Sequence, residues 1–153
     1  MPELFIGSDH RGYEKKNRLV EALVSGAIDD AGFTVSDLGP FSYNPDDDYN
    51  DIAIAVAKAV QENKDSRGIL LCGSANGVAI QANRFKGIRA IAPTIADIAR
   101  LGREHNDANI LCLSADFLDN NNIDSLSSIF LNTQFSGEER HQRRIKKLDQ
   151  EEI

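Results

Sequence analysis

The sequence predicts an α/β fold, a Rossmann-like three-layer α/β/α sandwich around a five-stranded parallel sheet. Short apolar runs alternate with longer segments of helical periodicity almost to the C-terminus, which is the pattern of strands joined by crossover helices. The 153 residues show no internal repeat and no linker. A hydrophobic content of 41% suffices for one core, so residues 1–153 are expected to form one domain.

In the first half of the chain, each apolar run ends at glycine or polar residues. The expected elements are a strand at 5–6, a helix that ends at Gly32, a strand at 33–38, a loop over 39–48, a helix over about 51–62 and a strand at 69–71. The first helix is extended to Gly32 because Leu19, Leu23, Ala27 and Ile28 recur at helical spacing before that glycine.

The second half continues the alternation. Its expected elements are a short helix after the turn 72–77, a strand at 88–92, a helix that ends at 105–107, a strand at 109–113, a helix over about 119–132 and a last helix over about 138–150. Thr94 and Asp97 have the spacing of an acidic capping box, which predicts the start of the fourth helix.

Composition excludes several classes of protein. A formal charge of -7 disfavours binding to nucleic acid phosphates and to anionic membrane surfaces. The longest wholly apolar stretch, 52–57, is too short to cross a bilayer, and no secretory signal is visible. Cys72 and Cys112 each lie in a short apolar run, which is typical of reduced thiols and argues against a disulfide framework. A cytoplasmic location is therefore expected.

Polar residues follow several of the predicted strands. In open parallel sheets, ligands bind outside the carboxyl ends of the strands. Asp9 and His10 follow the first strand, residues 72–77 follow the third, and Asp48 and Tyr49 close the long loop. We expect these segments to share one pocket.

The turn 72–77 contains Gly73 and Gly77, which permit close approach of the backbone and leave amides free to stabilise an oxyanion. Tight packing of strand against helix explains the same glycines equally well. Dinucleotide binding is disfavoured, because the first strand–helix unit offers only Gly7 and Gly12.

Cys72 ends a strand directly before a helix, where amides and the helix dipole favour the thiolate and are expected to lower its pKa. This position suits a general base or a nucleophile. Cys112 lies within an apolar strand and is expected to be buried and inert, a role that would fit Cys72 too if the turn were closed.

The three histidines, His10, His105 and His141, all stand beside polar residues, and none has the sequence context of a core histidine. No pair has the i, i+4 spacing of metal ligands, so no metal site is predicted. His105 is the better candidate acid or base because it lies at the end of an element. The alternative is a helix C-cap.

The last helix carries five basic residues, Arg140, Arg143, Arg144, Lys146 and Lys147. Arg140 and Arg144 share one face at i, i+4 spacing and suit a phosphate. The nearby acids are Glu138, Glu139, Asp149, Glu151 and Glu152. They balance these charges, so an ordinary solvated helix explains the pattern as well.

Together these segments resemble the ribose 5-phosphate isomerase B family, which includes galactose 6-phosphate isomerase subunits. The resemblance covers nearly the whole chain and rests on six ordered blocks: GSDHRG at 7–12, DY at 48–49, CGSANG at 72–77, ANRFKGIRA at 82–90, REHND at 103–107 and RHQRR at 140–144.

The resemblance implies a metal-free and cofactor-free aldose–ketose isomerisation of a sugar phosphate through an enediolate, in the pentose phosphate pathway of carbohydrate metabolism. By the same resemblance Cys72 is the base, His105 assists ring opening, and Ser74 with the turn amides holds the enediolate oxygen. Asp9 and Asn106 would bind sugar hydroxyls. The positions that match substrate contacts of the family are Asp9, His10, Tyr49, Gly73, Ala75, Asn76, Gly77, Asn106, Arg140 and Arg144.

The family also implies a homodimer with shared sites, in which the helix at about 138–150 reaches the partner so that its arginines grip the phosphate. A dimer and a tetramer would carry the same motifs.

Several residues depart from the family pattern. Asp116 stands where a phosphate-binding arginine is usual, and its carboxylate would repel phosphate unless it turns away or pairs with Arg140 or Arg144. Ser74 replaces threonine and Ala75 replaces glycine. Asn50 replaces proline, and Val78 stands where some relatives have a glutamate base.

Three alternatives therefore remain open: an isomerase of a tetrose or hexose phosphate, a non-catalytic sugar-phosphate binding protein, and a flavodoxin-like or nucleotide-binding module.

Overall fold

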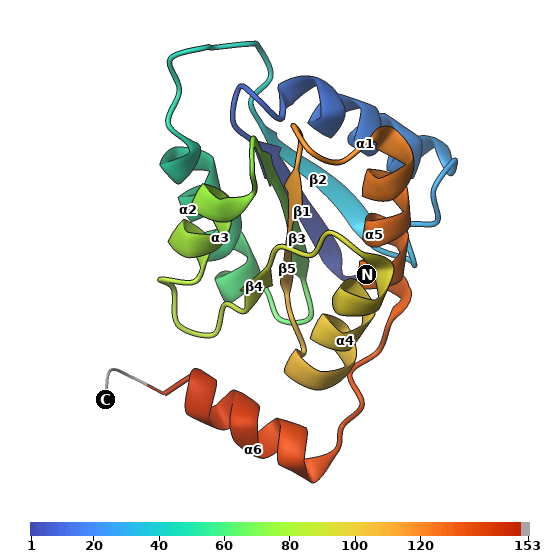
Figure 1. Ribbon diagram of the computed structural model, residues 1–153, viewed down its shortest axis with the longest axis vertical. Helices are drawn as coiled ribbons and strands as arrows, with labels where there is room; N and C mark the ends of the chain where they lie inside the picture. The colour runs from blue at the N-terminus through green and yellow to red at the C-terminus, as the bar shows by residue number, and fades with distance from the viewer. Residues whose placement is uncertain (151–153) are drawn as a thin grey trace.

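A computed structural model describes residues 1–150, which form a five-stranded parallel sheet covered by helices on both faces (Figure 1), as predicted. The strands are β1 (Glu3–Ser8), β2 (Thr34–Gly39), β3 (Arg67–Cys72), β4 (Ala90–Ile91) and β5 (Ile110–Ser114), in the spatial order β2-β1-β3-β5-β4. The helices are α1 (Tyr13–Ser25), α2 (Tyr49–Glu62), α3 (Asn76–Ala82), α4 (Ala96–Asn106), α5 (Asn120–Asn132) and α6 (Glu139–Leu148).

Each face of the sheet packs on its own set of helices. One core joins the sheet to α1, α4 and α5 through residues such as Leu19, Ala99 and Phe130. The other joins it to α2 and α3 through residues such as Val56 and Val78. β3 lies at the centre and all six of its residues are buried, which explains why its last four residues, 69–72, form a continuous apolar run rather than an alternating one.

The strand register places the functional segments. Ser8 at the end of β1 pairs with Leu71, and Cys72 at the end of β3 pairs with Ser114 at the end of β5. The carboxyl ends of these three strands therefore meet at one edge of the sheet, which we call the carboxyl edge. Their first residues meet at the opposite edge, which we call the amino edge.

The first helix ends earlier than predicted. Gly26 adopts a left-handed φ of 83° and its N–H bonds to the carbonyl oxygen of Leu23, so the helix stops there rather than at Gly32. Ile28 is still buried in the core, although the chain has left the helix. Ile28 is apolar because the segment between α1 and β2 packs on the core, and not because it continues the helical periodicity.

Two other local predictions also need correction. The capping box is wrong: Ile95 occupies the N-cap of α4, and no side chain there bonds to the first turn. The strand expected over 88–92 is only two residues long, Ala90–Ile91, at the edge of the sheet.

The last helix, α6, lies beyond the amino edge and apart from the rest of the molecule in Figure 1. His141 is its only buried residue within the described chain. Glu151 and Glu152, two of the acids weighed against the basic residues of α6, lie outside the described residues. None of the helices within residues 1–150 has the length and apolarity needed to cross a membrane.

Candidate active site

Three of the predicted segments meet at the carboxyl edge. The N–H of Asp9 bonds to the carbonyl oxygen of Leu71 at 3.2 Å, which joins the end of β1 to the end of β3. Tyr49, at the start of α2, packs on the turn after β3, because a Cβ built at Gly77 would lie 2.6 Å from the Tyr49 ring. Only glycine at position 77 permits this approach. The three segments therefore lie together at the carboxyl edge, while a single pocket that they share stays a prediction.

The turn 72–77 has a defined shape. Ala75 holds a φ of 70°, the left-handed conformation that favours glycine, so the chain adopts this backbone despite carrying a Cβ there. The N–H of Asn76 bonds to Ser74 Oγ at 3.3 Å. From the neighbouring strand, Ser114 Oγ donates to the carbonyl oxygen of Gly73 at 2.6 Å. One bond within the turn and one bond from the neighbouring strand therefore hold the turn in place.

Cys72 is buried at the root of this turn, with 5% of its surface exposed. Burial raises the pKa of the Cys72 thiol above its usual value, and the nearby Asp9 charge acts in the same direction. The N–H groups of Val78, Ala75 and Gly77 lower the pKa but do not outweigh burial. The expected lowering of the pKa is therefore wrong. Cys112 is fully buried, which raises its pKa strongly, as an inert thiol requires.

Asp9, His10 and Asp47 form a polar cluster beside Cys72. Asp47 Oδ1 accepts from the His10 backbone N–H at 3.1 Å and lies 2.7 Å from His10 Nδ1. Burial raises the pKa of Asp9, although the N–H of Gly12 bonds to its carboxylate at 3.1 Å. Sequence reasoning missed Asp47. The run of three acids before Tyr49 was its only signal.

The same cluster has the only ligand set in residues 1–150 that could hold a metal ion, with donor atoms within 4.8 Å of one another. Asp47 Oδ1, however, already contacts the backbone N–H and the Nδ1 atom of His10.

Asp116 pairs with a residue that was not expected. Its carboxylate accepts from Arg11 Nε at 3.0 Å and also pairs with Arg11 Nη2. The Arg11 side chain lies against Gly73, where a Cβ would come within 2.9 Å of Arg11 Nε. Asp116 is thus neutralised at the carboxyl edge by Arg11, and not by Arg140 or Arg144. Arg11 belongs to the first sequence block but was not assigned a role.

The other predicted site residues lie at the amino edge. His105 and Asn106 end α4, and the chain then enters β5 at Ile110, which pairs with Gly68 near the start of β3. Cys72 lies four residues farther along β3, a separation of roughly 13 Å at about 3.3 Å per residue. One chain therefore does not bring Cys72 and His105 together.

His105 and His141 stack at this end, with ring centres 4.3 Å apart. His141 is only 4% exposed, and its Nδ1 lies 2.9 Å from Ser136 Oγ, so this histidine is buried against α4 although it belongs to neither apolar core. Burial, His105 and the arginines of α6 lower the pKa of His141.

The arginines of α6 differ in their partners. Arg140 pairs with Glu138, and Arg143 pairs with Glu139. Both pairs are exposed, as expected for a solvated helix. Arg144 is exposed and has no hydrogen bond or ion pair within the described part of the chain. Its guanidinium is therefore available to an external anion.

Each chain thus carries two complementary sets of groups. The carboxyl edge offers a buried thiol, a carboxylate and a backbone turn suited to an oxyanion. The amino edge offers an imidazole, an amide and guanidinium groups suited to a sugar phosphate.

Comparisons with known proteins agree on one family. Residues 4–148 match the family model described as Ribose/Galactose Isomerase. A probable ribose-5-phosphate isomerase B of Mycoplasma genitalium is 40% identical over 146 residues, which cover 95% of this chain and 92% of that protein. The ribose-5-phosphate isomerase B of Mycobacterium tuberculosis (strain ATCC 25618 / H37Rv) is 35% identical over 142 residues, or 93% and 85% of the two chains.

Solved structures are similar over the same span. A crystal structure of ribose-5-phosphate isomerase B from Mycoplasma genitalium with bound ribulose-5-phosphate has a TM-score of 0.88 at 40% identity and covers 96% of this chain and 93% of that one. The type B ribose 5-phosphate isomerase of Trypanosoma cruzi has a TM-score of 0.88 at 36% identity, with coverage of 96% and 95%.

Proposed function

The chain belongs to the ribose/galactose isomerase family and is an aldose–ketose isomerase, and on that premise we propose that it interconverts D-ribose 5-phosphate and D-ribulose 5-phosphate. The observation that carries the proposal is the position of Cys72, buried at the end of the central strand with Asp9 beside it. The solved relative that binds ribulose-5-phosphate supports this choice of substrate.

In the proposed reaction, the Cys72 thiolate removes the proton from C2 of the open-chain aldose. The electrons of the C–H bond form the C1–C2 double bond of an enediolate, and the aldehyde oxygen takes the negative charge. The proton of the O2 hydroxyl then passes to O1, which becomes the C1 hydroxyl, while O2 becomes the ketone oxygen and the C1–C2 double-bond electrons take back at C1 the proton held by Cys72. Ser74 and the turn amides of Gly73, Ala75, Asn76 and Gly77 hold the oxygen on which charge develops.

The remaining residues bind and open the sugar. His105 moves a proton at the ring oxygen, and Asp9 and Asn106 bind hydroxyl groups. His10 and Tyr49 line the carboxyl edge, and Arg140 and Arg144 hold the phosphate. The unpaired guanidinium of Arg144 supports this last role.

The site requires a second copy of the chain. Cys72 and His105 lie at opposite edges of the sheet, so a two-fold partner that places its amino edge on this carboxyl edge completes two identical sites. Exposed apolar side chains crowd the loops of the carboxyl edge and its surroundings: Phe41, Tyr43, Ile95, Ile98 and Phe117. Such a surface is typical of a protein interface. In this arrangement α6 of the single domain reaches the partner.

A tetrose or hexose phosphate is the second candidate substrate. The Arg11–Asp116 pair favours it, because the pair replaces the single arginine usual at position 116 and so changes the group that faces a phosphate. A cytoplasmic location is proposed because Cys72 and Cys112 are both free thiols.

Proton NMR in deuterated water tests the reaction. The wild-type chain and Cys112→Ala, a buried-thiol control, are expected to exchange the C2 proton of ribose 5-phosphate and produce ribulose 5-phosphate. Cys72→Ala is expected to do neither while keeping its circular dichroism spectrum. Near-normal turnover by Cys72→Ala would disprove the assigned base. If wild-type protein left ribose 5-phosphate unchanged but converted a tetrose or hexose phosphate, the second candidate would replace the first. Thermal stabilisation by the sugar phosphates without turnover of any would instead indicate a binding protein.

A further inference from the structure

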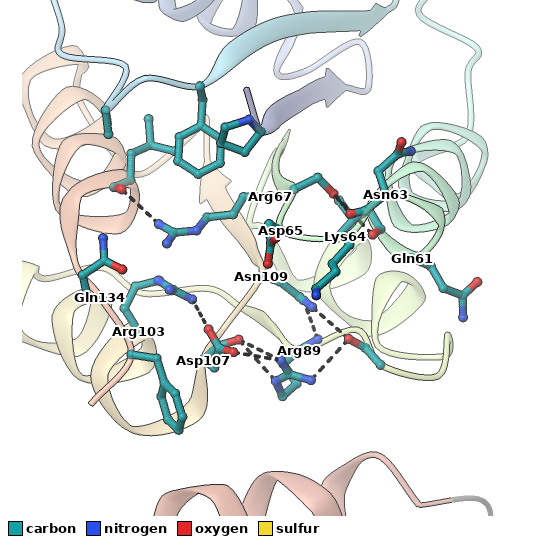
Figure 2. Close-up of a pocket in the computed structure, with 18 of the residues that line it drawn as sticks. Gln61, Asn63, Lys64, Asp65, Arg67, Arg89, Arg103, Asp107, Asn109 and Gln134 are labelled. Carbon is teal, nitrogen blue, oxygen red and sulfur yellow. Dashed lines mark hydrogen bonds and ion pairs between the residues drawn. The ribbon is translucent and has the colours of Figure 1, made fainter. Parts of the chain in front are cut away.

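A cavity of about 750 Å³ opens at the amino edge, away from Cys72 (Figure 2). Its charged lining residues are five basic ones, Lys64, Arg67, Lys86, Arg89 and Arg103, and two acidic ones, Asp65 and Asp107. The chain as a whole carries a formal charge of -7. The cavity therefore concentrates positive charge in an acidic protein.

Arg67 is the central residue of this cavity. It begins β3 and is 9% exposed, and its Nη1 donates to the carbonyl oxygens of Phe130 and Leu131 at the end of α5. No ion pair to a carboxylate reaches Arg67 from any described residue, and Nε and Nη2 have no acceptor there. A buried cation without a counter-ion is costly.

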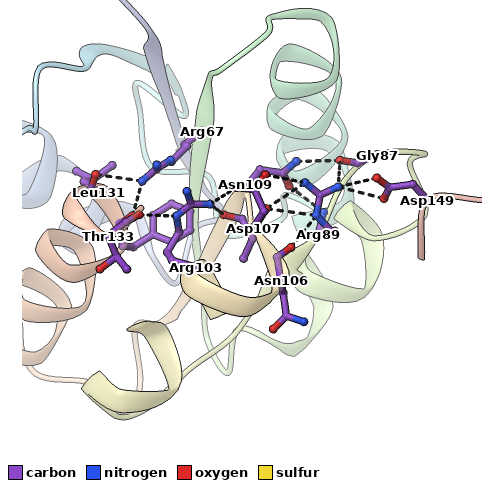
Figure 3. Close-up of polar contacts among 12 residues, drawn as sticks. Arg67, Gly87, Arg89, Arg103, Asn106, Asp107, Asn109, Leu131, Thr133 and Asp149 are labelled. Atoms are coloured by element: carbon purple, nitrogen blue, oxygen red, sulfur yellow. Dashed lines mark hydrogen bonds and ion pairs between the residues drawn. The ribbon is translucent and has the colours of Figure 1, made fainter. Parts of the chain in front are cut away.

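Arg103 adds a second guanidinium. It is 3% exposed, and it donates to Thr133, Asp107 and Ala108 through Nε and Nη1 (Figure 3). Its Nη2 has no acceptor among residues 1–150. Both guanidinium groups lie over the same Phe130 ring, at 5.6 and 5.8 Å from its centre. Burial and the Arg103 charge together lower the pKa of Arg67 to about 10.

The unpaired donors are accessible. Residues 1–150 contain only three fully buried polar side-chain atoms without a partner, and none belongs to Arg67 or Arg103. Because a guanidinium has five N–H donors, Arg67 keeps three of them free and Arg103 keeps two. Lys64 adds an exposed ammonium at the same cavity.

We infer that this cavity binds a phosphorylated anion through Arg67, Arg103 and Lys64. A phosphoryl group matches the site better than a carboxylate, because it offers three terminal oxygens and up to two negative charges to several N–H donors. The volume also accommodates a ligand larger than phosphate itself. This inference does not depend on the proposed isomerase reaction.

Isothermal titration calorimetry with sodium pyrophosphate in a low-salt buffer tests the site on the full chain. We expect the wild-type chain to bind. Lys64→Glu is expected to weaken binding by about tenfold, the size of one charge-assisted contact. Lys58→Glu makes the same charge change at an exposed position of α2 outside the cavity and is expected to bind like wild type.

Two further variants separate this cavity from the arginines of α6. Arg67→Met is expected to abolish binding at this cavity, leaving at most the binding that Arg140 and Arg144 provide, and because Arg67 is buried the thermal unfolding of the variant is measured alongside. The double variant Arg140→Ala/Arg144→Ala removes the two arginines that are proposed to hold the substrate phosphate. It is expected to keep binding pyrophosphate at the cavity. Absence of binding by the wild-type chain, or binding that is lost in the double variant but kept in Lys64→Glu, would overturn the inference.

A parallel titration with ADP distinguishes two sources of the phosphoryl group. Tighter binding of ADP than of pyrophosphate would identify an organic phosphate, and equal binding would identify the phosphoryl group alone as what is recognised. Either result, with the Lys64→Glu effect, supports the site.

Discussion

Arg11 and Asp116, 105 positions apart in the sequence, form an ion pair at the carboxyl edge of the sheet, with Arg11 Nε 3.0 Å from Asp116 Oδ2. Both side chains are partly exposed, at 57% and 34%, so the pair contributes little to stability. Its effect is electrostatic: it neutralises a carboxylate next to Gly73, where a negatively charged substrate is proposed to bind.

Arg11→Ala is therefore expected to raise KM for ribose 5-phosphate about tenfold with little change in kcat, because the free Asp116 charge would repel the phosphate. Steady-state kinetics measure both parameters. The double variant Arg11→Ala/Asp116→Asn is expected to recover most of the affinity. An unchanged KM in the single variant would show that the pair lies away from the phosphate.

Mixing two inactive variants tests the shared site. Cys72→Ala and His105→Ala are each expected to be inactive alone, since every dimer would lack one group in both sites. After subunit exchange at equal concentrations, half of the dimers are mixed and each has one intact site, so activity is expected to reach about a quarter of the wild-type value. A mixture no more active than its components would contradict a site built from two chains.

The raised pKa of Cys72 predicts slow alkylation at neutral pH, because the thiolate is the reacting species. Labelling by iodoacetamide is followed by mass spectrometry. Its rate is expected to keep rising with pH above the pKa of an ordinary cysteine. Cys112, fully buried, serves as the internal control and is expected to remain unlabelled in the folded protein. A labelling rate that levels off below about pH 8 would disagree with this prediction.

Lys16 anchors the long loop from inside the molecule. It is 0% exposed, and its Nζ donates to both Asp37 carboxylate oxygens at 3.0 Å and to the Pro40 carbonyl oxygen at 2.9 Å. Lys16→Met is expected to lower the free energy of unfolding by about 3 kcal/mol, because it leaves Asp37 unpaired. Urea denaturation measures this loss. Lys58→Met, at an exposed position, is expected to change the value by less than about 0.5 kcal/mol. Equal effects of the two substitutions would refute the role of Lys16.

His141 predicts a pH dependence of stability. Its pKa in the folded chain lies below the ordinary value of 6.5 because of burial, His105, Arg140 and Arg144, with Glu138 acting in the opposite direction. At a pH between the lowered pKa of the folded chain and the ordinary pKa of the unfolded chain, His141 binds a proton only when the chain is unfolded. The free energy of unfolding therefore falls as the pH drops below about 6.5. Urea denaturation at pH 7.5 and 5.5 is expected to show a smaller loss for His141→Asn than for wild type. Equal losses would argue against this assignment.

The sheet and most helices were predictable because their signals are local. The buried run of β3 and the polar residues after β1 and β3 determine both the layers and the carboxyl edge. The end of α1 was not predictable from apolar spacing, since Ile28 is buried in either arrangement.

The edge of the sheet on which each candidate residue lies was predictable, but the local contacts were not. That His105 lies far from Cys72 follows from strand–helix alternation, because a helix that begins at the carboxyl edge ends at the amino edge. The Arg11–Asp116 pair and the raised pKa of Cys72 depend on distances and burial that no sequence pattern contains.

The separation of Cys72 and His105 on opposite edges also has a genetic consequence. If the proposed dimer forms in a cell with two alleles, a chain that carries only Cys72→Ala still donates a working His105 to its partner, so the defect is expected to behave as recessive. A chain that carries both Cys72→Ala and His105→Ala would spoil both sites of every mixed dimer. That allele would be dominant negative: it would inactivate wild-type subunits in proportion to its expression.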